Sequence, residues 1–109
     1  MTNAIRGEVE LQVKHKGEEK TMIMCVTTGA LAELETELGK PTSQLEQIIA
    51  ASEMPTINSV IYWLLRGGGN DLEKKDMITL SFKIKPAIAA IREAFKAWSE
   101  SDEDDTPKG

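Results

Sequence analysis

In the stretch Arg6-Gly7-Glu8-Val9-Glu10-Leu11-Gln12-Val13, apolar and polar side chains alternate. Because successive side chains of a β-strand point to opposite faces, this alternation predicts a strand with one buried face and one solvated face. The polar residues 15–19 suit a hairpin loop, and the apolar run 21–26 suits the returning strand. The chain is therefore expected to open with an antiparallel β-hairpin over about residues 7–26. Two strands alone are marginally stable in water, so this hairpin must pack against elements later in the chain.

Helical patterns come after the hairpin, between about residues 28 and 98, and about five short helices are expected. The first ends at Gly39, a residue suited to the left-handed conformation that closes many helices. A second, short helix comes next, where Ser43 and Glu46 have the spacing of a capping box. The third helix begins near Thr56 and has the clearest apolar stripe. Its apolar residues recur at helical spacing: Ile57, Val60, Ile61, Leu64 and Leu65.

The next segment is ambiguous. Asn70 and Glu73 have a capping spacing that favours a fourth helix over about residues 70–84. Residues 76–84 also contain a strand-like alternation, so helix and strand both stay open for them. Pro86 suits the first turn of a fifth helix, because its missing N–H would have no partner there in any case.

Length and charge define the broad class of protein. The chain has 109 residues, 40% apolar and 28% charged, which suits one domain with one core. The formal net charge is −5, and acidic residues gather in residues 100–109, which are expected to form a disordered tail. The sequence thus predicts a single α+β domain over residues 1–99, a two-stranded antiparallel hairpin packed on about five short helices. The negative charge also disfavours nucleic acid as a partner.

Cysteine content and apolar run length bear on the compartment. Cys25 is the single cysteine, so no internal disulfide can form, and a reducing compartment is expected. Residues 1–6 lack the apolar core of a secretory signal, and no apolar run approaches the ~20 residues that span a bilayer. We expect a cytoplasmic protein without a membrane partner.

Residue types that carry catalysis are scarce. His15 falls in the expected hairpin loop, where a lone histidine is usually solvated, and Cys25 falls in an apolar strand, where free cysteine behaves as a small hydrophobe. Gly67-Gly68-Gly69 lacks the Gly-Lys-Ser/Thr ending of a phosphate-binding loop, so helix termination with a flexible joint is favoured. We expect no catalytic residue, no cofactor site and no metal site, and a binding protein rather than an enzyme.

Three segments together carry a family resemblance. They are the strand Arg-Gly-Glu-Val-Glu-Leu at residues 6–11, the helix Gly-Ala-Leu-Ala-Glu-Leu-Glu-Thr-Glu-Leu-Gly at residues 29–39, and Pro-Ala-Ile-Ala-Ala-Ile-Arg-Glu-Ala-Phe at residues 86–95. In this order they resemble the gene transfer agent family of small phage-tail proteins, which is grouped with the tail assembly chaperones of long-tailed phages. These motifs are structural rather than catalytic, and they span most of the chain that is expected to be ordered.

The resemblance implies a function in virion assembly. A tail assembly chaperone binds the long, helical tape measure protein in the cytoplasm of the bacterial host and keeps it soluble until the tail tube polymerises. The alternative is a structural tail tube or tail-completion subunit that is retained in the particle. Tail tube subunits and a second copy of the chain are further expected partners. A prophage DNA-binding regulator and a small enzyme are the remaining classes, disfavoured by the charge and by the lack of a catalytic motif.

A chaperone for helical segments needs an accessible apolar surface. Met22 and Met24 share one face of the second strand, and methionine adapts well at binding surfaces, although it more often fills a core. Tyr62 and Trp63 flank the apolar stripe of the third helix, and aromatic residues often anchor interfaces, although in a small domain they are more often core residues. We expect these four residues to contribute to the client-binding surface.

Overall fold

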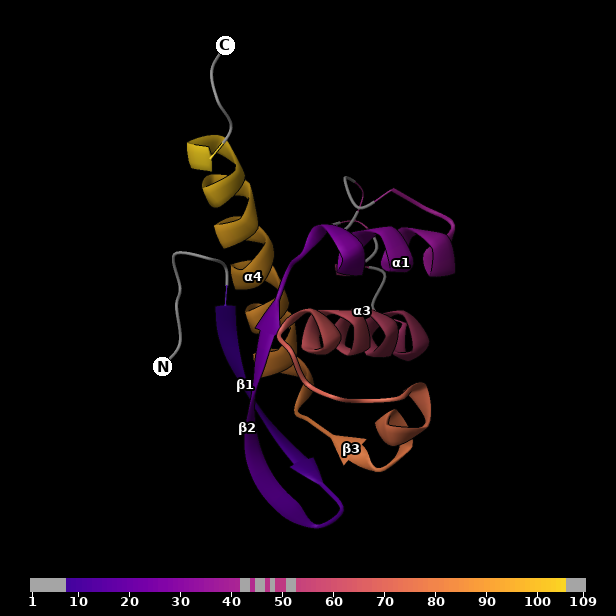
Figure 1. The fold of residues 1–109 in the computed structure, drawn as a ribbon. Coiled ribbons are helices and arrows are strands. Elements are labelled where there is room, and N and C mark those ends of the chain that lie inside the picture. The colour runs from indigo at the N-terminus through magenta and orange to yellow at the C-terminus, as the bar shows by residue number, and fades with distance from the viewer. Residues whose placement is uncertain (1–7, 42–43, 45–46, 48, 51–52, 106–109) are drawn as a thin grey trace.

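The computed structural model describes residues 8–41, 44, 47, 49–50 and 53–105, with side chains as far as Ser99. It is an α+β fold with a small antiparallel sheet and helices packed around it (Figure 1). Its elements in chain order are β1 (Glu8–His15), β2 (Glu18–Cys25), α1 (Thr28–Leu38), α3 (Met54–Gly67), the 3-10 helix η3 (Lys74–Ile78), β3 (Leu80–Ser81) and α4 (Ile84–Asp105).

The hairpin is confirmed, with longer strands than the sequence predicted. β1 and β2 pair antiparallel, and Leu11 lies opposite Met22. The connection is only Lys16-Gly17, with φ angles of 55° and 84°, rather than a loop over residues 15–19. Two left-handed residues give the tight turn whose twist matches that of the flanking strands. His15 is therefore the last residue of a strand and not a loop residue.

The sheet has a third strand. Its order is β2-β1-β3, and the short β3 pairs with the end of β1, with His15 opposite Leu80. The expected fourth helix over residues 70–84 is therefore wrong. The segment contains only η3, where Glu73 and Asp76 form a capping box, before the chain enters β3. The strand-like alternation of this segment corresponds to β3, which pairs with the free edge of β1. This tertiary pairing decided the local structure against the helical capping pattern.

Other helix boundaries differ in part from the expectation. The described residues contain three α-helices and η3 rather than about five helices. The short helix expected around Ser43 and Glu46 lies mostly outside the described residues, as do the two residues themselves. α3 begins at Met54, with Pro55 in its first turn, and Gly39 ends α1 at φ 69° as predicted.

The last helix is longer than expected. α4 begins at Ile84, with Pro86 in its first turn, and its backbone is helical to Asp105, although disorder was expected from residue 100. Once a helix has nucleated, each further residue adds one hydrogen bond for one ordered residue, so a packed helix can continue into a polar segment. Residues 106–109 lie outside the described part of the chain.

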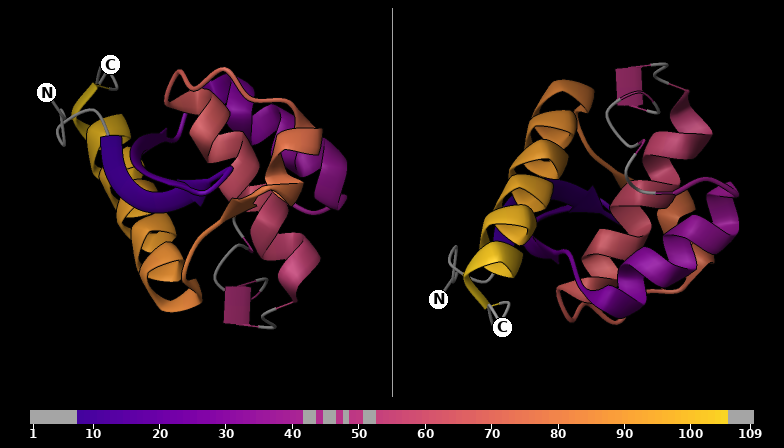
Figure 2. Two further views of the ribbon diagram at one scale, coloured as in Figure 1. Left: turned by 90° about the horizontal axis from the view of Figure 1, so that it is seen from below. Right: turned by 90° about the horizontal axis from the view of Figure 1, so that it is seen from above.

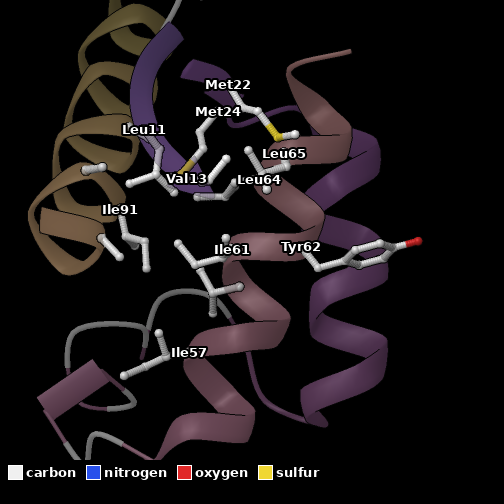
Figure 3. Packing of buried hydrophobic residues seen from close by; sticks show 14 of the residues in the cluster. Leu11, Val13, Met22, Met24, Ile57, Ile61, Tyr62, Leu64, Leu65 and Ile91 are labelled. Atoms are coloured by element: carbon white, nitrogen blue, oxygen red, sulfur yellow. The ribbon is translucent and has the colours of Figure 1, made fainter. Parts of the chain in front are cut away.

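The hairpin lies between α4 on one side and the pair α1 and α3 on the other, as the two views in Figure 2 show. Leu11 and Val13 project from β1 into the space between α4 and α3, where Ile91 meets Ile61 and Leu64 (Figure 3). α4 brings mainly small side chains to this contact, because Ala87 and Ala94 are fully buried. Small residues let the helix approach the sheet closely, so the core is built from strand and α3 side chains.

Candidate functional site

Three of the four residues expected on the client surface belong to the core. Met24 is 0% exposed, Tyr62 is 5% exposed and Met22 is 9% exposed. Figure 3 shows Met22 pointing toward Leu65 of α3 and Met24 pointing into the core beside Val13, while the hydroxyl end of Tyr62 points away from the sheet. Trp63 is half-buried and lies on the other side of α3 from the core residues Ile61 and Leu65. In this conformation only Trp63 among the four presents a substantial surface.

The indole of Trp63 is held by a carboxylate on α1. Its Nε1 donates a hydrogen bond of 3.0 Å to Glu37, which also accepts from the hydroxyl of Ser59 and from the ammonium of Lys74. We call Glu37, Ser59, Trp63 and Lys74 the Glu37 cluster. It joins α1, α3 and η3 at the surface.

Aromatic and cationic groups continue from this cluster along α3. The Lys74 ammonium lies 5.7 Å from the centre of the Trp63 ring, and the Trp63 and Tyr62 rings meet edge to face at 4.8 Å. Arg66 donates hydrogen bonds to the Tyr62 hydroxyl at 3.1 Å and to the Leu72 carbonyl at 2.8 Å. These contacts fix the Trp63 ring in one orientation, so its exposed edge is a rigid aromatic surface.

The ionisation of Glu37 is set by these contacts. Burial raises the pKa of this carboxyl, but the hydrogen bonds from Lys74, Ser59 and Trp63 and the charge of Lys74 outweigh burial, so its pKa lies below the ordinary 4.5. The hydrogen bond to Glu37 in turn raises the pKa of Lys74. The ionised carboxylate of Glu37 thus accepts from three donors on two other elements, which suits a structural contact.

The Glu37 cluster predicts a stability loss on acidification. The folded-state pKa of Glu37 is depressed. The ionised carboxylate therefore adds to the free energy of unfolding above pH 4.5, and this added stability is lost as the pH falls through the folded-state pKa. We expect Glu37→Gln to lower the free energy of unfolding by about 1 kcal/mol at neutral pH, since a partly exposed ion pair is screened by solvent. Urea unfolding across the acid range should show wild type and variant converging at low pH.

The control for this prediction is Glu93→Gln, which removes a carboxylate from an exposed position of α4. Its curve should run parallel to the wild-type curve, with no convergence specific to acid pH. If Glu37→Gln also runs parallel, then the cluster does not contribute to stability in the way its geometry indicates.

Two residues of the glycine run pack closely against the backbone of β2. A Cβ at Gly67 would lie 2.3 Å from the carbonyl oxygen of Cys25, and a Cβ at Gly68 would lie 2.0 Å from that of Ile23. The side-chain amide of Asn70 donates to the Ile23 carbonyl at 2.7 Å and to the Leu65 carbonyl at 2.8 Å. The end of α3 is therefore fixed against the outer edge of β2. The sequence prediction of helix termination is confirmed, and Gly67 and Gly68 have an additional packing role that the sequence did not predict.

His15 and Cys25 occupy structural positions. The Nε2 atom of His15 is buried and has no hydrogen-bond partner among the described residues. Burial and the neighbouring charge of Glu8 raise the pKa of the Cys25 thiol, so the reactive thiolate is disfavoured. Over the described residues, no three His, Cys, Asp or Glu side chains come together as metal ligands would.

The tertiary contacts of Glu37, Ser59, Lys74 and Asn70 were not predicted from the sequence. Glu37 lies 22 residues from Ser59 and 37 from Lys74 in the chain, and Asn70 lies 47 residues from Ile23. No local pattern connects residues at such separations. The one available signal was a Gly-Gly-Gly-Asn run after a strongly amphipathic helix, which is compatible with close approach to another backbone.

No family model matches the chain, and neither the curated proteins nor the solved structures include one with significant similarity. Within the portion that the structure describes, no helix has both the length and the apolar character needed to cross a bilayer.

Proposed function

We propose that this protein is a phage, prophage or gene transfer agent tail assembly chaperone that binds the tape measure protein until the tail tube polymerises. One observation carries the proposal: the resembling segments become framework elements of the same domain. Residues 8–11 lie in β1, residues 29–38 lie in α1 and residues 86–95 lie in α4. β1 and α4 share one core, and α1 packs on α3. The resembling segments thus belong to one packed domain, which supports the proposal that they serve a shared function.

The client surface is proposed at Trp63 and the adjoining part of α1. Trp63 is half-buried, and the Glu37 cluster fixes its ring before any partner binds. A rigid aromatic side chain loses little conformational freedom on binding, which is why aromatic residues often dominate interface energetics. Leu38 is also half-buried, directly after Glu37. An amphipathic helical segment of the client would place an apolar side chain against this ring.

Met22, Met24 and Tyr62 take a different role in this proposal. Since they are in the core, they support the surface from beneath and do not contact the client in the conformation described. Tyr62 does this directly, because its ring packs edge to face against Trp63.

The first experiment is an affinity pull-down of the tagged full chain from cells that are assembling tails, with mass spectrometry of the co-purifying proteins. The proposal expects a very long helical tail protein to co-purify and this chain to be absent from finished particles. Recovery of tube subunits, with this chain retained in the particle, would instead establish the structural-subunit alternative. Recovery of no tail protein would contradict both functions.

The proposed surface predicts a specific loss of client binding. Trp63→Ala should weaken binding of the captured tail protein by about tenfold or more, because an interface anchor of this kind is often worth about 2 kcal/mol or more. Trp63→Phe keeps an aromatic ring but removes the donor to Glu37, so it should fall between wild type and Trp63→Ala. Binding would be measured by calorimetry with the client segment that the pull-down identifies.

The matched control is Met54→Ala, which removes a 50% exposed apolar side chain from the start of the same helix. It should leave client affinity within about twofold, as expected for a residue outside the energetic centre of an interface. Circular dichroism and thermal unfolding must show all three variants folded. Equal losses for Met54→Ala and Trp63→Ala would reject Trp63 as the anchor.

A further inference from the structure

α4 has an apolar seam that the rest of the domain covers only in part. Ile84, Ile88, Ile91, Phe95 and Trp98 are separated alternately by four and three residues, the spacing of a helix that pairs with another helix. Ile91 is fully buried, whereas Ile84 is 37% exposed and the other three are half-buried. The seam therefore serves the core at Ile91 and retains accessible apolar surface on both sides of that residue.

The charges of α4 are separated between its two ends. Lys83 and Lys85 are exposed where the helix begins. Five of its last six residues, over 100–105, are acidic. Acidic residues at a helix C-terminus oppose the helix dipole, so this end is electrostatically unfavourable in an isolated helix. A cationic partner along the last turns would offset both the dipole and the mutual repulsion of the carboxylates.

We propose that α4 pairs with α4 of a second copy of this chain in antiparallel orientation. Only an antiparallel arrangement sets the lysine-bearing beginning of each helix against the acidic end of the other, whereas a parallel arrangement aligns like charges. A twofold axis then makes one surface complementary to itself, as in most homodimers. The 22-residue helix is about 33 Å long, enough for several layers of seam residues.

The shape of the molecule leaves room for a second copy to pair with α4. The acidic end of α4 projects beyond the hairpin and the other helices in Figure 1, so a second molecule can approach it without displacing α1 or α3. Trp98, in the second half of α4, is half-buried and packs against the edge of the core. With a crossing point near residue 93, Trp98 of each copy would face Ile88 of the other. This pairing does not depend on the proposed chaperone function.

The test is sedimentation equilibrium of the full chain in wild-type form and in two charge-reversed forms. The basic-end variant is Lys83→Glu with Lys85→Glu. The acidic-end variant replaces Asp102, Glu103, Asp104 and Asp105 with lysine, which changes the net charge of residues 100–105 from −5 to +3. Wild type should dimerise. Each variant alone should show a dimer dissociation constant raised by about tenfold or more, because like charges meet at both ends of the pair. An equimolar mixture of the two variants should recover a dimer close to wild type in affinity, since their ends are again complementary.

Both variants should fold, because carboxylates near a helix N-terminus and lysines near its C-terminus suit the dipole. Loss of dimer therefore cannot be attributed to loss of α4. The matched control for the basic-end variant is Lys14→Glu with Lys40→Glu, which makes the same charge change at exposed positions outside α4 and should leave the dimer intact.

A wild-type chain that stays monomeric at the highest soluble concentration would overturn the proposal. So would a dimer that both charge-reversed forms retain, or a mixture that fails to associate. A monomer that binds the tail protein through α4, with binding lost in the basic-end variant, would also overturn it and assign the seam to the client. Loss of client binding in Trp63→Ala, with the dimer unchanged, would separate the two proposals.

Discussion

Gly68→Ala is expected to destabilise the protein by about 3–5 kcal/mol, the range of severe single substitutions. The backbone of Gly68 has φ −81° and ψ 2°, which alanine adopts without strain, so the effect comes from the added methyl group alone. That methyl group would lie 2.0 Å from the Ile23 carbonyl oxygen and 2.7 Å from its carbonyl carbon. Because both atoms belong to the backbone of β2, a side-chain rotation cannot relieve the clash, and the end of α3 must move away from the sheet.

The measurement is thermal and urea unfolding of Gly68→Ala beside Gly29→Ala. Gly29 lies in α1 with nothing within 4 Å of an added Cβ, so alanine there should be neutral or stabilise the helix by about 0.5–1 kcal/mol. For a domain of this size, a loss of about 3 kcal/mol lowers the melting temperature by about 12 °C or more. Equal melting temperatures for the two variants would show that α3 does not approach β2 as closely as described.

The same contact explains what the sequence could and could not predict. The hairpin and the apolar stripe of α3 are consequences of local periodicity, and each was predicted from residues within a few positions of one another. Gly68 was correctly placed at the end of a helix. That it must remain glycine depends on Ile23, far earlier in the chain, and no local pattern contains that contact.

The error over residues 70–84 has the same origin. The capping spacing of Asn70 and Glu73 is real, but Asn70 directs its amide to the carbonyls of Ile23 and Leu65 and not to a new helix. Only Glu73 begins a helical turn, the short η3. Leu80 then pairs with His15 at the edge of β1, so the chain continues as a strand. Local capping patterns indicate where a helix can start, while packing decides whether it does.

The expected client-binding residues could not be placed correctly from the sequence for a similar reason. Methionine and aromatic residues can serve in a binding surface or in a core, and their identity alone does not decide between the two. The register of the hairpin places Met22 and Met24 opposite Leu11 and Val9, on the face that the helices cover. Trp63 differs from Tyr62 only by one position on α3, yet that step of the helix moves a side chain from the core to the half-exposed surface.

Asn70→Asp should be the second most damaging of the proposed substitutions, with a loss of about 2–3 kcal/mol at neutral pH. The asparagine amide donates to the Ile23 carbonyl at 2.7 Å and the Leu65 carbonyl at 2.8 Å, and so joins the edge of β2 to the last turn of α3. Aspartate has the same shape but no donor when ionised, and its negative charge would face two carbonyl oxygens. The folded state would therefore disfavour ionisation and raise the pKa of this carboxyl.

The sign of the pH dependence distinguishes this mechanism from a simple loss of contacts. A raised folded-state pKa means that the variant is relatively stable at low pH, where the protonated carboxyl can donate one hydrogen bond, and loses stability as pH rises through that pKa. Asn70→Ala removes both donors without adding charge, so it should cost about 1–2 kcal/mol at every pH. Urea unfolding of both variants from acid to neutral pH should show Asn70→Asp crossing from the more stable to the less stable of the two. Parallel curves would mean that the Asn70 side chain does not face the two carbonyl groups, and that the edge of β2 is closed by the glycine contact alone.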